Sequence, residues 1–296
     1  PAARAGAAVA ACLQSHARDH GLDPAARAKR AEAIARQCGR LAHEMEFRFL
    51  FHEQRQLLSI GFRVDEQVLD SNAYDLLASD ARLASFLAIA KGDIPTRHWF
   101  RLRRTLMPLG RSMALQSWSG SMFEYLMPTL LMREPSGSLL ALSNRAAVRR
   151  QIVYGQQRGV PWGISESQYN ARDRQMNYQY SGFGVPSLGL KRGLAENLVI
   201  APYATMLAAM IAPRQARANL DRLTGLGALG RYGWYEAIDF TRQRLPDGLD
   251  QAVIKAYMAH HQGMAILGLA DVLQDGRMRE RLHAELAGYP GVRTAT

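Results

Sequence analysis

The sequence predicts an all-α protein in which helices form a cup and aromatic, acidic connections line one rim. Apolar residues recur with helical spacing over most of the 296 residues. Between the helical stretches lie long connections that hold a large share of the Trp and Tyr residues, at residues 107–120, 159–191 and 227–249. Long connections in a compact domain usually carry function. We therefore expect the functional site at this rim.

Capping residues, prolines and apolar patterns predict the positions of the helices and of one hairpin. Pro24 opens a helix that ends at Glu44. A second helix, capped by Ser71 or Asn72, is expected to end at Lys91, before Gly92-Asp93-Ile94-Pro95. Phenylalanines alternate from residue 47, and an apolar run follows a polar turn, so a small β-hairpin is predicted over residues 47–64. Further helices are expected at residues 121–132, 139–154, 194–211, 213–226, 249–273 and 277–287.

Two regions differ in composition. Residues 1–45 are rich in Ala and Arg and are predicted to form an N-terminal helical linker or capping segment, while residues 46–296 hold the main domain. A chain that begins at Pro1 is expected to be an excised piece, and its first residues lack the basic region, apolar stretch and cleavage site of a secretory signal. Cys12 and Cys38 are too few for a zinc site or a disulfide framework, which favours a reduced, cytosolic setting. Apolar runs are too short to span a membrane.

The formal net charge of +11 admits nucleic acid, an anionic membrane surface or acidic substrates as partners. The arginines are scattered through helical stretches, and no nucleic-acid-binding pattern accompanies them. We therefore expect solvated helix faces and no nucleic-acid partner. A basic nucleic-acid binder would show affinity that falls steeply with salt.

Several short motifs give no site. The GxGxxG pattern of residues 225–230 follows a helix instead of a strand, so a helix C-cap is favoured over dinucleotide binding. Ser165 lacks the G-x-S-x-G elbow of serine hydrolases. His260 and His261 point about 100° apart on a helix, which argues against a shared metal. One of the two is either a core histidine or a hydrogen-bond donor in the cleft. No metal or cofactor is expected.

Carboxylates beside aromatic residues form the most informative pattern. Each one alone is explained by helix capping or by an arginine partner. Together they suit sugar chemistry, because aromatic faces stack on pyranose rings while two carboxyls act on the glycosidic bond. The carboxylates are Asp75, Asp80, Glu124, Glu166, Glu236 and Asp239, and the aromatic residues are Trp118, Trp162, Tyr169, Tyr178, Tyr180 and Trp234.

Five stretches carry a resemblance to a known family. The stretches are Asn72-Ala73-Tyr74-Asp75-Leu76-Leu77-Ala78-Ser79, Ala88-Ile89-Ala90-Lys91-Gly92-Asp93-Ile94-Pro95, Met122-Phe123-Glu124-Tyr125-Leu126-Met127-Pro128, Gly159-Val160-Pro161-Trp162-Gly163-Ile164-Ser165-Glu166-Ser167 and Tyr257-Met258-Ala259-His260-His261-Gln262-Gly263-Met264. They resemble the central glycoamylase-like domain of bacterial cyclic β-1,2-glucan synthases. The resemblance runs from about Arg40 to Leu273. It implies an (α/α)6 barrel over residues 46–296 that acts as a retaining transglycosylase, closing linear β-1,2-glucan into rings.

The resemblance also implies site residues. Glu166 would be the nucleophile and Asp80 the general acid/base. The family usually has Glu at the second position, and Asp shortens its reach by one methylene. Glu124 is the substitute to test first. Candidates for holding sugar hydroxyls are Asp75, Glu124, Glu236, Asp239, His260 and Gln262, and the rings expected to bind the sugar are Trp118, Trp162, Tyr169, Tyr178, Tyr180 and Trp234.

Alternatives remain within and outside the enzymes. The same domain type includes endo-β-1,2-glucanases, which hydrolyse the polymer, and the Asp at position 80 makes a catalytically inactive glucan-binding module conceivable. The resemblance implies covalently linked partners in a larger synthase, namely a membrane-embedded glycosyltransferase region and a phosphorylase-like region. The chain would then be a cytoplasmic domain of a bacterial inner-membrane protein.

Overall fold

The computed structural model describes residues 2–21, 23–73, 75–77, 79–110 and 112–293, without the side chains of residues 2–9, 79, 80 and 293. The chain divides into two compact units, Pro1–Phe47 and Arg48–Thr296. The first unit contains helices α1 (Ala2–Gly21) and α2 (Pro24–Glu44). The Asp23 side chain caps α2 by accepting the backbone N–H of Ala26 at 2.8 Å. Helix α2 has the bounds that the sequence predicts.

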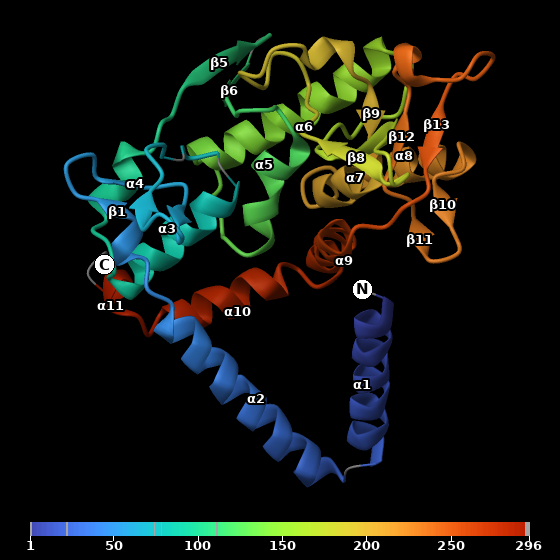
Figure 1. The fold of residues 1–296 in the computed structure, drawn as a ribbon. Helices are drawn as coiled ribbons and strands as arrows, with labels where there is room; N and C mark the ends of the chain where they lie inside the picture. Colours follow the sequence, from blue (N-terminus) through green and yellow to red (C-terminus); the bar gives the residue numbers. More distant parts are fainter. Residues whose placement is uncertain (1, 22, 74, 78, 111, 294–296) are drawn as a thin grey trace. The chain divides into compact units, whose positions relative to one another are not determined.

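Helices are the main regular elements of the second unit, and short strands and loops connect them (Figure 1). Its central helix, α7 (Pro202–Ala208), is buried at all seven residues and contacts α5, α8 and α9. A helix that is apolar on every side is stable only inside a core. The other helices are α3 (Ser79–Lys91), α4 (Arg97–Arg101), α5 (Met122–Leu126), α6 (Leu139–Gln157), α8 (Pro213–Gly225), α9 (Ala259–Leu273), α10 (Arg277–Leu286) and α11 (Pro290–Arg293), with 3-10 turns η1 (Arg48–Leu50), η2 (Met127–Leu130), η3 (Leu194–Glu196) and η4 (Arg242–Arg244).

Short strands fill the connections between these helices. Five hairpins pair β1 (Phe51–His52) with β2 (Leu57–Leu58), β3 (Phe62–Arg63) with β4 (Val68–Leu69), β5 (Leu106–Leu109) with β6 (Ser112–Leu115), β7 (Ser167–Arg172) with β8 (Tyr178–Ser181) and β10 (Leu229–Gly230) with β11 (Gly233–Trp234). The pairing of Phe51 with Leu58 confirms the hairpin predicted over residues 47–64. Helices predominate as predicted, and the strands among the described residues are only two to six residues long.

A three-stranded antiparallel sheet joins distant parts of the chain, in the order β13 (Ala252–Ile254), β12 (Ala237–Asp239), β9 (Val199–Ile200). Ile238 lies opposite Val253 on one side and Ile200 on the other. These strands are rich in β-branched residues, which pack well on a pleated surface. In Figure 1 the sheet lies at the end of the second unit that holds α7 and α8.

Three predicted helices were too long. The helix expected over residues 72–91 begins at Ser79, because the Asp75 side chain accepts the N–H of Leu77 in a turn. The helix expected over residues 194–211 begins at Pro202, since Val199 and Ile200 form β9. The helix expected over residues 249–273 begins at Ala259, since residues 252–254 form β13. In the last two cases, pairing with β12 replaces helical hydrogen bonds.

The remaining helix predictions are confirmed. Helices α6, α8 and α10 match the expected ranges 139–154, 213–226 and 277–287 to within three residues at each end. The range 121–132 contains α5 followed directly by the 3-10 turn η2, with Pro128 inside that turn. Pro128 cannot donate a backbone hydrogen bond, which accounts for the tighter winding.

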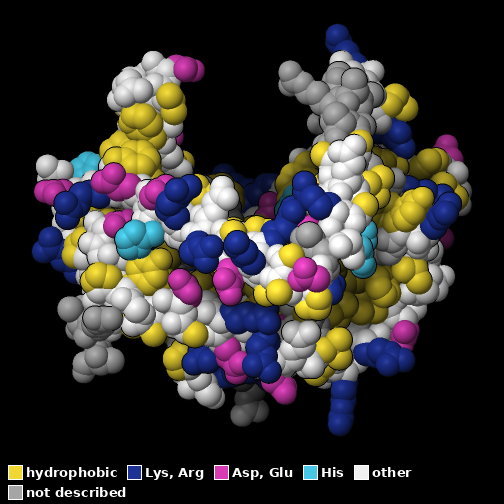
Figure 2. All heavy atoms as spheres, turned by 90° about the horizontal axis from the view of Figure 1, so that it is seen from below, with side chains coloured by type: hydrophobic (Ala, Val, Ile, Leu, Met, Phe, Trp, Pro, Cys, Tyr) yellow, Lys and Arg dark blue, Asp and Glu magenta, His cyan; other side chains and the backbone are white. Residues whose placement is uncertain are grey.

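The basic residues are dispersed over the surface. On the face drawn in Figure 2, Lys and Arg side chains lie among acidic and apolar ones without forming a stripe. Some arginines form exposed ion pairs with nearby carboxylates, such as Arg217 with Asp221 and Arg63 with Glu66. Throughout the described ranges, every helix falls short of the length and apolarity that crossing a bilayer requires.

A buried arginine anchors α3 to its neighbours. Arg82 is 1% exposed and donates to the carbonyl oxygen of Tyr125 at 3.0 Å. Its Nη1 atom lies 3.8 Å from Glu134, which also accepts from Asn144 on α6 at 2.7 Å. Burial lowers the pKa of Arg82 to about 10, and the charge of Glu134 opposes this shift. The start of α3, which holds Asp80, is therefore fixed by a charge in the core.

We expect Arg82→Ala to lower the free energy of unfolding by about 3–5 kcal/mol, because Glu134 would remain buried without its ion pair. The control is Arg217→Ala, which removes an exposed ion pair with Asp221 and should change stability by less than about 1 kcal/mol. Urea unfolding followed by circular dichroism measures both. Equal effects of the two variants would contradict this anchoring role.

A buried histidine joins the first hairpin to α3. His98 is fully buried, with Nδ1 at 3.1 Å from the Gln56 carbonyl oxygen and Nε2 at 2.9 Å from Ser85 Oγ. A neutral ring satisfies both contacts, with Nδ1–H donating and Nε2 accepting. Burial lowers the pKa of His98, and the hydrogen bond to Gln56 opposes the shift.

Because its folded pKa lies below the unfolded value of about 6.5, the unfolded chain binds the proton more readily. Stability from His98 is therefore complete above about pH 6.5 and is lost as the pH falls toward the folded pKa. We expect His98→Asn to remove this dependence. The test compares unfolding free energies of both proteins from pH 7 down to pH 5; a difference that does not shrink with falling pH would contradict it.

Candidate functional site

The segment that leads to Glu166 is held by side chains from the core. Both backbone groups of Ile164 bond to the Gln151 amide of α6, at 2.8 and 2.7 Å. The Tyr203 hydroxyl of α7 lies 2.8 Å from Ser165 Oγ and 2.9 Å from the Glu166 carbonyl oxygen. Since Gln151 and Tyr203 are buried, the backbone of Glu166 has a fixed position.

Gly163 lets this segment approach α7 closely. Its φ of +116° lies where side chains are strained, and a Cβ would meet Thr205 Oγ1 at 2.9 Å. The Gly163 carbonyl oxygen accepts the N–H of Ala201 at 2.9 Å. The Trp-Gly-Ile-Ser-Glu stretch is therefore built to pack on the start of α7.

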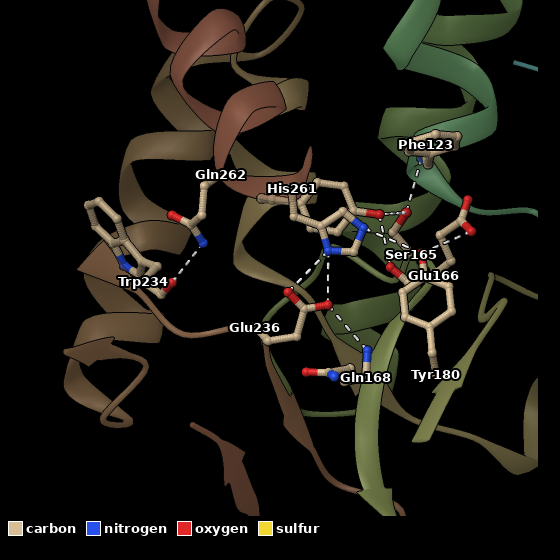
Figure 3. Close-up of polar contacts among 10 residues, drawn as sticks. Phe123, Ser165, Glu166, Gln168, Tyr180, Trp234, Glu236, His261 and Gln262 are labelled. Atoms are coloured by element: carbon tan, nitrogen blue, oxygen red, sulfur yellow. Dashed lines mark hydrogen bonds and ion pairs between the residues drawn. The ribbon is translucent and has the colours of Figure 1, made fainter. Parts of the chain in front are cut away.

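A chain of polar side chains extends from Glu166 into the core (Figure 3). The Tyr180 hydroxyl, from β8, donates to Glu166 Oε2 at 3.0 Å and lies 3.4 Å from His261 Nε2. On the other side of its ring, His261 Nδ1 lies 2.8 and 3.1 Å from the two carboxylate oxygens of Glu236. Side chains from β8, α9 and the segment before β12 thus form one polar chain that ends at the Glu166 carboxylate.

The imidazole of His261 is clamped. The residue is fully buried, and its ring stacks on Tyr203 with centroids 3.9 Å apart and an interplanar angle of 11°. Glu236, which is 2% exposed, also accepts the backbone N–H of Gln168 at 3.2 Å. Burial raises the pKa of Tyr203 well above its usual value, and the charge of Glu166 adds to the shift. Tyr203 therefore stays a neutral hydrogen-bonding support.

Glu124 is engaged by its own loop. Its carboxylate accepts the backbone N–H groups of Trp118, Ser119 and Ser121 at 3.0–3.2 Å, and the Ser119 hydroxyl at 2.6 Å. The Ser121 side chain in turn accepts the N–H of Glu124, which completes a capping box at the start of α5. This arrangement closes the loop of residues 117–121 around one carboxyl group.

The other predicted polar residues have separate environments. Asp239 is fully buried and pairs with Arg244, with Nε and Oδ2 2.7 Å apart. Asp75 accepts the N–H of Leu77 at 3.0 Å. Gln262 donates to the Trp234 carbonyl oxygen at 3.2 Å. Asp80 lies in the first turn of α3, but its side chain is outside the described residues.

The predicted aromatic residues fall into two groups. Trp162 is only 7% exposed and packs in the hydrophobic core, whereas Tyr169 is half-buried and packs edge-on against Phe183. More accessible are Trp118 at 65% and Tyr180 at 41% exposure, together with the half-buried Trp234 and Tyr178. The Tyr178 ring also lies under Arg172, 4.2 Å from the guanidinium carbon.

Sequence reasoning favoured His260 as a site residue, whereas the buried partner of Glu236 is His261. His260 is exposed, and its ring lies 6.5 Å from that of Tyr180. A signal was present, because the buried positions of α9 include Met264, Ala265 and Gly268, three, four and seven residues after His261. Tyr203 and Ser165 were also missed, since nothing local distinguishes them from core residues.

We expect Glu124→Ala to lower the free energy of unfolding by about 1–3 kcal/mol, since several loop donors would lose their acceptor. Thermal unfolding measures the change, with the exposed Glu53→Ala as the control. A stable Glu124→Ala protein that had lost only activity would instead assign this carboxyl a chemical role.

Comparisons with known proteins complete the description. Residues 72–285 match the model of the Glycoamylase family, described as "Putative glucoamylase". The chain is 51% identical over 284 residues to the cyclic β-(1,2)-glucan synthase NdvB of Rhizobium meliloti (strain 1021), a match that spans 95% of this chain but 10% of that protein.

Solved structures share the fold at low identity. An endo-β-1,2-glucanase from Chitinophaga pinensis, in complex with sophorotriose and glucose, aligns with a TM-score of 0.63 at 15% identity, over 88% of this chain and 63% of its own. A β-1,2-glucanase from Parabacteroides distasonis aligns with a TM-score of 0.60 at 13% identity, over 94% of this chain and 42% of its own.

Proposed function

Because this chain belongs to the Glycoamylase family, we propose that it is a retaining transglycosylase that converts linear β-1,2-glucan into cyclic β-1,2-glucan. The support is the 51% identity to a cyclic β-1,2-glucan synthase, of which this chain spans about a tenth. Structures with the same fold include enzymes named for β-1,2-glucan. The chain would accordingly act as one carbohydrate-active domain of a larger synthase.

We propose that the helices of the second unit belong to an (α/α)6 barrel, with residues 1–45 as a linker or capping segment and residues 46–296 as the catalytic domain. The buried α7, packed against α5, α8 and α9, is consistent with helices that wrap around a shared core. The covalent partners would be a membrane-embedded glycosyltransferase region and a phosphorylase-like region. The domain itself would lie in the cytoplasm of a bacterium, at its inner membrane.

The proposed reaction needs two carboxyls. Asp80 protonates the glycosidic oxygen while a Glu166 oxygen attacks the anomeric carbon, and the reducing-side fragment leaves. Asp80 then removes the proton from a hydroxyl at the other end of the same chain, which displaces Glu166 and closes the ring. Retaining enzymes hold the two carboxyls about 5–5.5 Å apart. Glu124 remains the substitute for Asp80, although its oxygens already accept several hydrogen bonds.

The observation that carries this proposal is the fixed setting of Glu166. Its backbone is held by buried groups of α6 and α7, and its carboxylate accepts a hydrogen bond from Tyr180. A nucleophile must be aimed to within a fraction of an ångström, which such support provides. Substrate rings would stack on the accessible aromatic side chains, namely Trp118, Tyr178, Tyr180 and Trp234. Sugar hydroxyls would be bound at the same rim by Asp75, His260 and Gln262.

Two alternatives use the same site. An endo-β-1,2-glucanase would hydrolyse the glycosyl-enzyme with water, as the names of the solved relatives suggest. A glucan-binding module without activity would bind the polymer and leave it intact, and the shorter Asp80 gives that reading a physical basis. Transfer rather than hydrolysis requires that a sugar hydroxyl be positioned and water excluded.

We expect the 296-residue chain to convert linear β-1,2-glucan into rings, and Glu166→Gln to lower the rate by on the order of 10³-fold while binding persists. Chromatography that separates rings from reducing oligosaccharides measures the products, and calorimetry measures binding. Glu53→Gln, an exposed acid on the first hairpin, is the matched control.

The product mixture separates the alternatives. Reducing fragments without rings would assign the chain as a hydrolase. Binding without conversion by the unaltered chain would assign it as a glucan-binding module. A Glu166→Gln protein as active as the parent would remove Glu166 from the chemistry.

A further inference from the structure

We propose that Glu236 and His261 are positioning residues that hold the Tyr180 hydroxyl on Oε2 of Glu166, so that Oε1 is the oxygen that attacks the sugar. This inference rests on the proposed function, in which Glu166 is the nucleophile. The reaction steps above leave Glu236 and His261 without a role, although both are buried and charged or titratable.

The proton arrangement follows from the partners. Both oxygens of Glu236 face His261 Nδ1, and a carboxylate only accepts, so Nδ1 carries a proton and donates. Nε2 then has no proton to donate, so its 3.4 Å approach to the Tyr180 oxygen is a packing contact, and His261 positions Tyr180 through its ring. The single Tyr180 proton goes to Glu166, at 3.0 Å, because a carboxylate forms the stronger hydrogen bond.

Tyr180 needs this support because it projects from a two-stranded hairpin and is 41% exposed. Its ring stacks on His261, with centroids 6.0 Å apart and an interplanar angle of 27°. His261 in turn lies against Tyr203 of the core, 3.9 Å between centroids. The stacked rings of Tyr203 and His261 thus connect the buried helix α7 to the exposed phenol of Tyr180.

The consequence for the reaction concerns the second oxygen of Glu166. When Oε1 bonds the anomeric carbon, Oε2 becomes the carbonyl oxygen of the glycosyl-enzyme. When the acceptor hydroxyl displaces Glu166, the electron pair of the broken bond returns to the carboxylate. A donor already aimed at Oε2 stabilises that developing charge without reorganisation.

The test is a double-mutant cycle on ring formation. Tyr180→Phe removes only the hydroxyl, and His261→Asn keeps an N–H for Glu236 but removes the ring that packs against Tyr180. We expect Tyr180→Phe to lower kcat about 10- to 100-fold with little change in KM. His261→Asn should lower kcat about three- to tenfold alone, and should have no further effect in the Tyr180→Phe background.

The control is His52→Asn, the same substitution at an exposed histidine of β1, which should leave kcat unchanged. Melting temperatures show whether each variant folds. A structural role for His261 would lower kcat by the same factor in both backgrounds. If the Tyr180 hydroxyl served only to bind sugar, Tyr180→Phe would raise KM with kcat unchanged. Either result would overturn the inference while leaving the proposed function in place.

A second measurement does not need activity. In the protein labelled with ¹⁵N-histidine, the His261 signals are assigned by their loss in His261→Asn. We expect Tyr180→Phe to shift the Nε2 signal and to leave the Nδ1 proton signal unchanged. An unchanged Nε2 signal would overturn the inference even if the unaltered chain proved inactive on glucan, an outcome that would refute only the proposed function.

Discussion

The hydrogen bonds that hold residues 163–166 against α6 and α7 are the constraint on which the site depends. Gln151 binds both backbone groups of Ile164, and Tyr203 reaches the next two residues. Buried backbone groups need such partners, since leaving them unpaired is costly. Here the partners come from side chains in place of a neighbouring strand. The Tyr203 ring also stacks on His261, which packs against Tyr180, the hydrogen-bond donor to the Glu166 carboxylate. Tyr203 therefore helps to position both the backbone and the side chain of Glu166.

Sequence reasoning succeeded where local signals decide the structure. Asp23-Pro24 begins α2 as expected, and Ser138 caps α6 where apolar periodicity starts. It failed at β9 and β13, because their partner strand β12 lies about 40 residues from one and 13 from the other along the chain. A short run such as Val199-Ile200 suits a helix or a strand equally well, and only the tertiary partner selects between them.

In the candidate site, too, local sequence predicted some features, and others depended on contacts between distant residues. Composition grouped Glu166, Tyr180 and Glu236, which the structure joins through His261. It could not separate these residues from carboxylates that close loops, because Glu124 and Asp239 have similar aromatic neighbours in sequence but bind Ser119 and Arg244 in space. Whether an acid serves chemistry or architecture depends on its partners, which no single segment contains.

The residues that support Glu166 are translated after Glu166 itself, which affects when its side chain becomes oriented. Glu166 is followed by 35 residues before α7 begins at Pro202, and Tyr203 belongs to that helix. During translation, Glu166 therefore leaves the ribosome well before the helix that orients it. His261 and Glu236 emerge later still. A nascent chain that has reached only β8 contains Glu166 without Tyr203 and His261, so this carboxyl gains its geometry only when the last third of the domain folds.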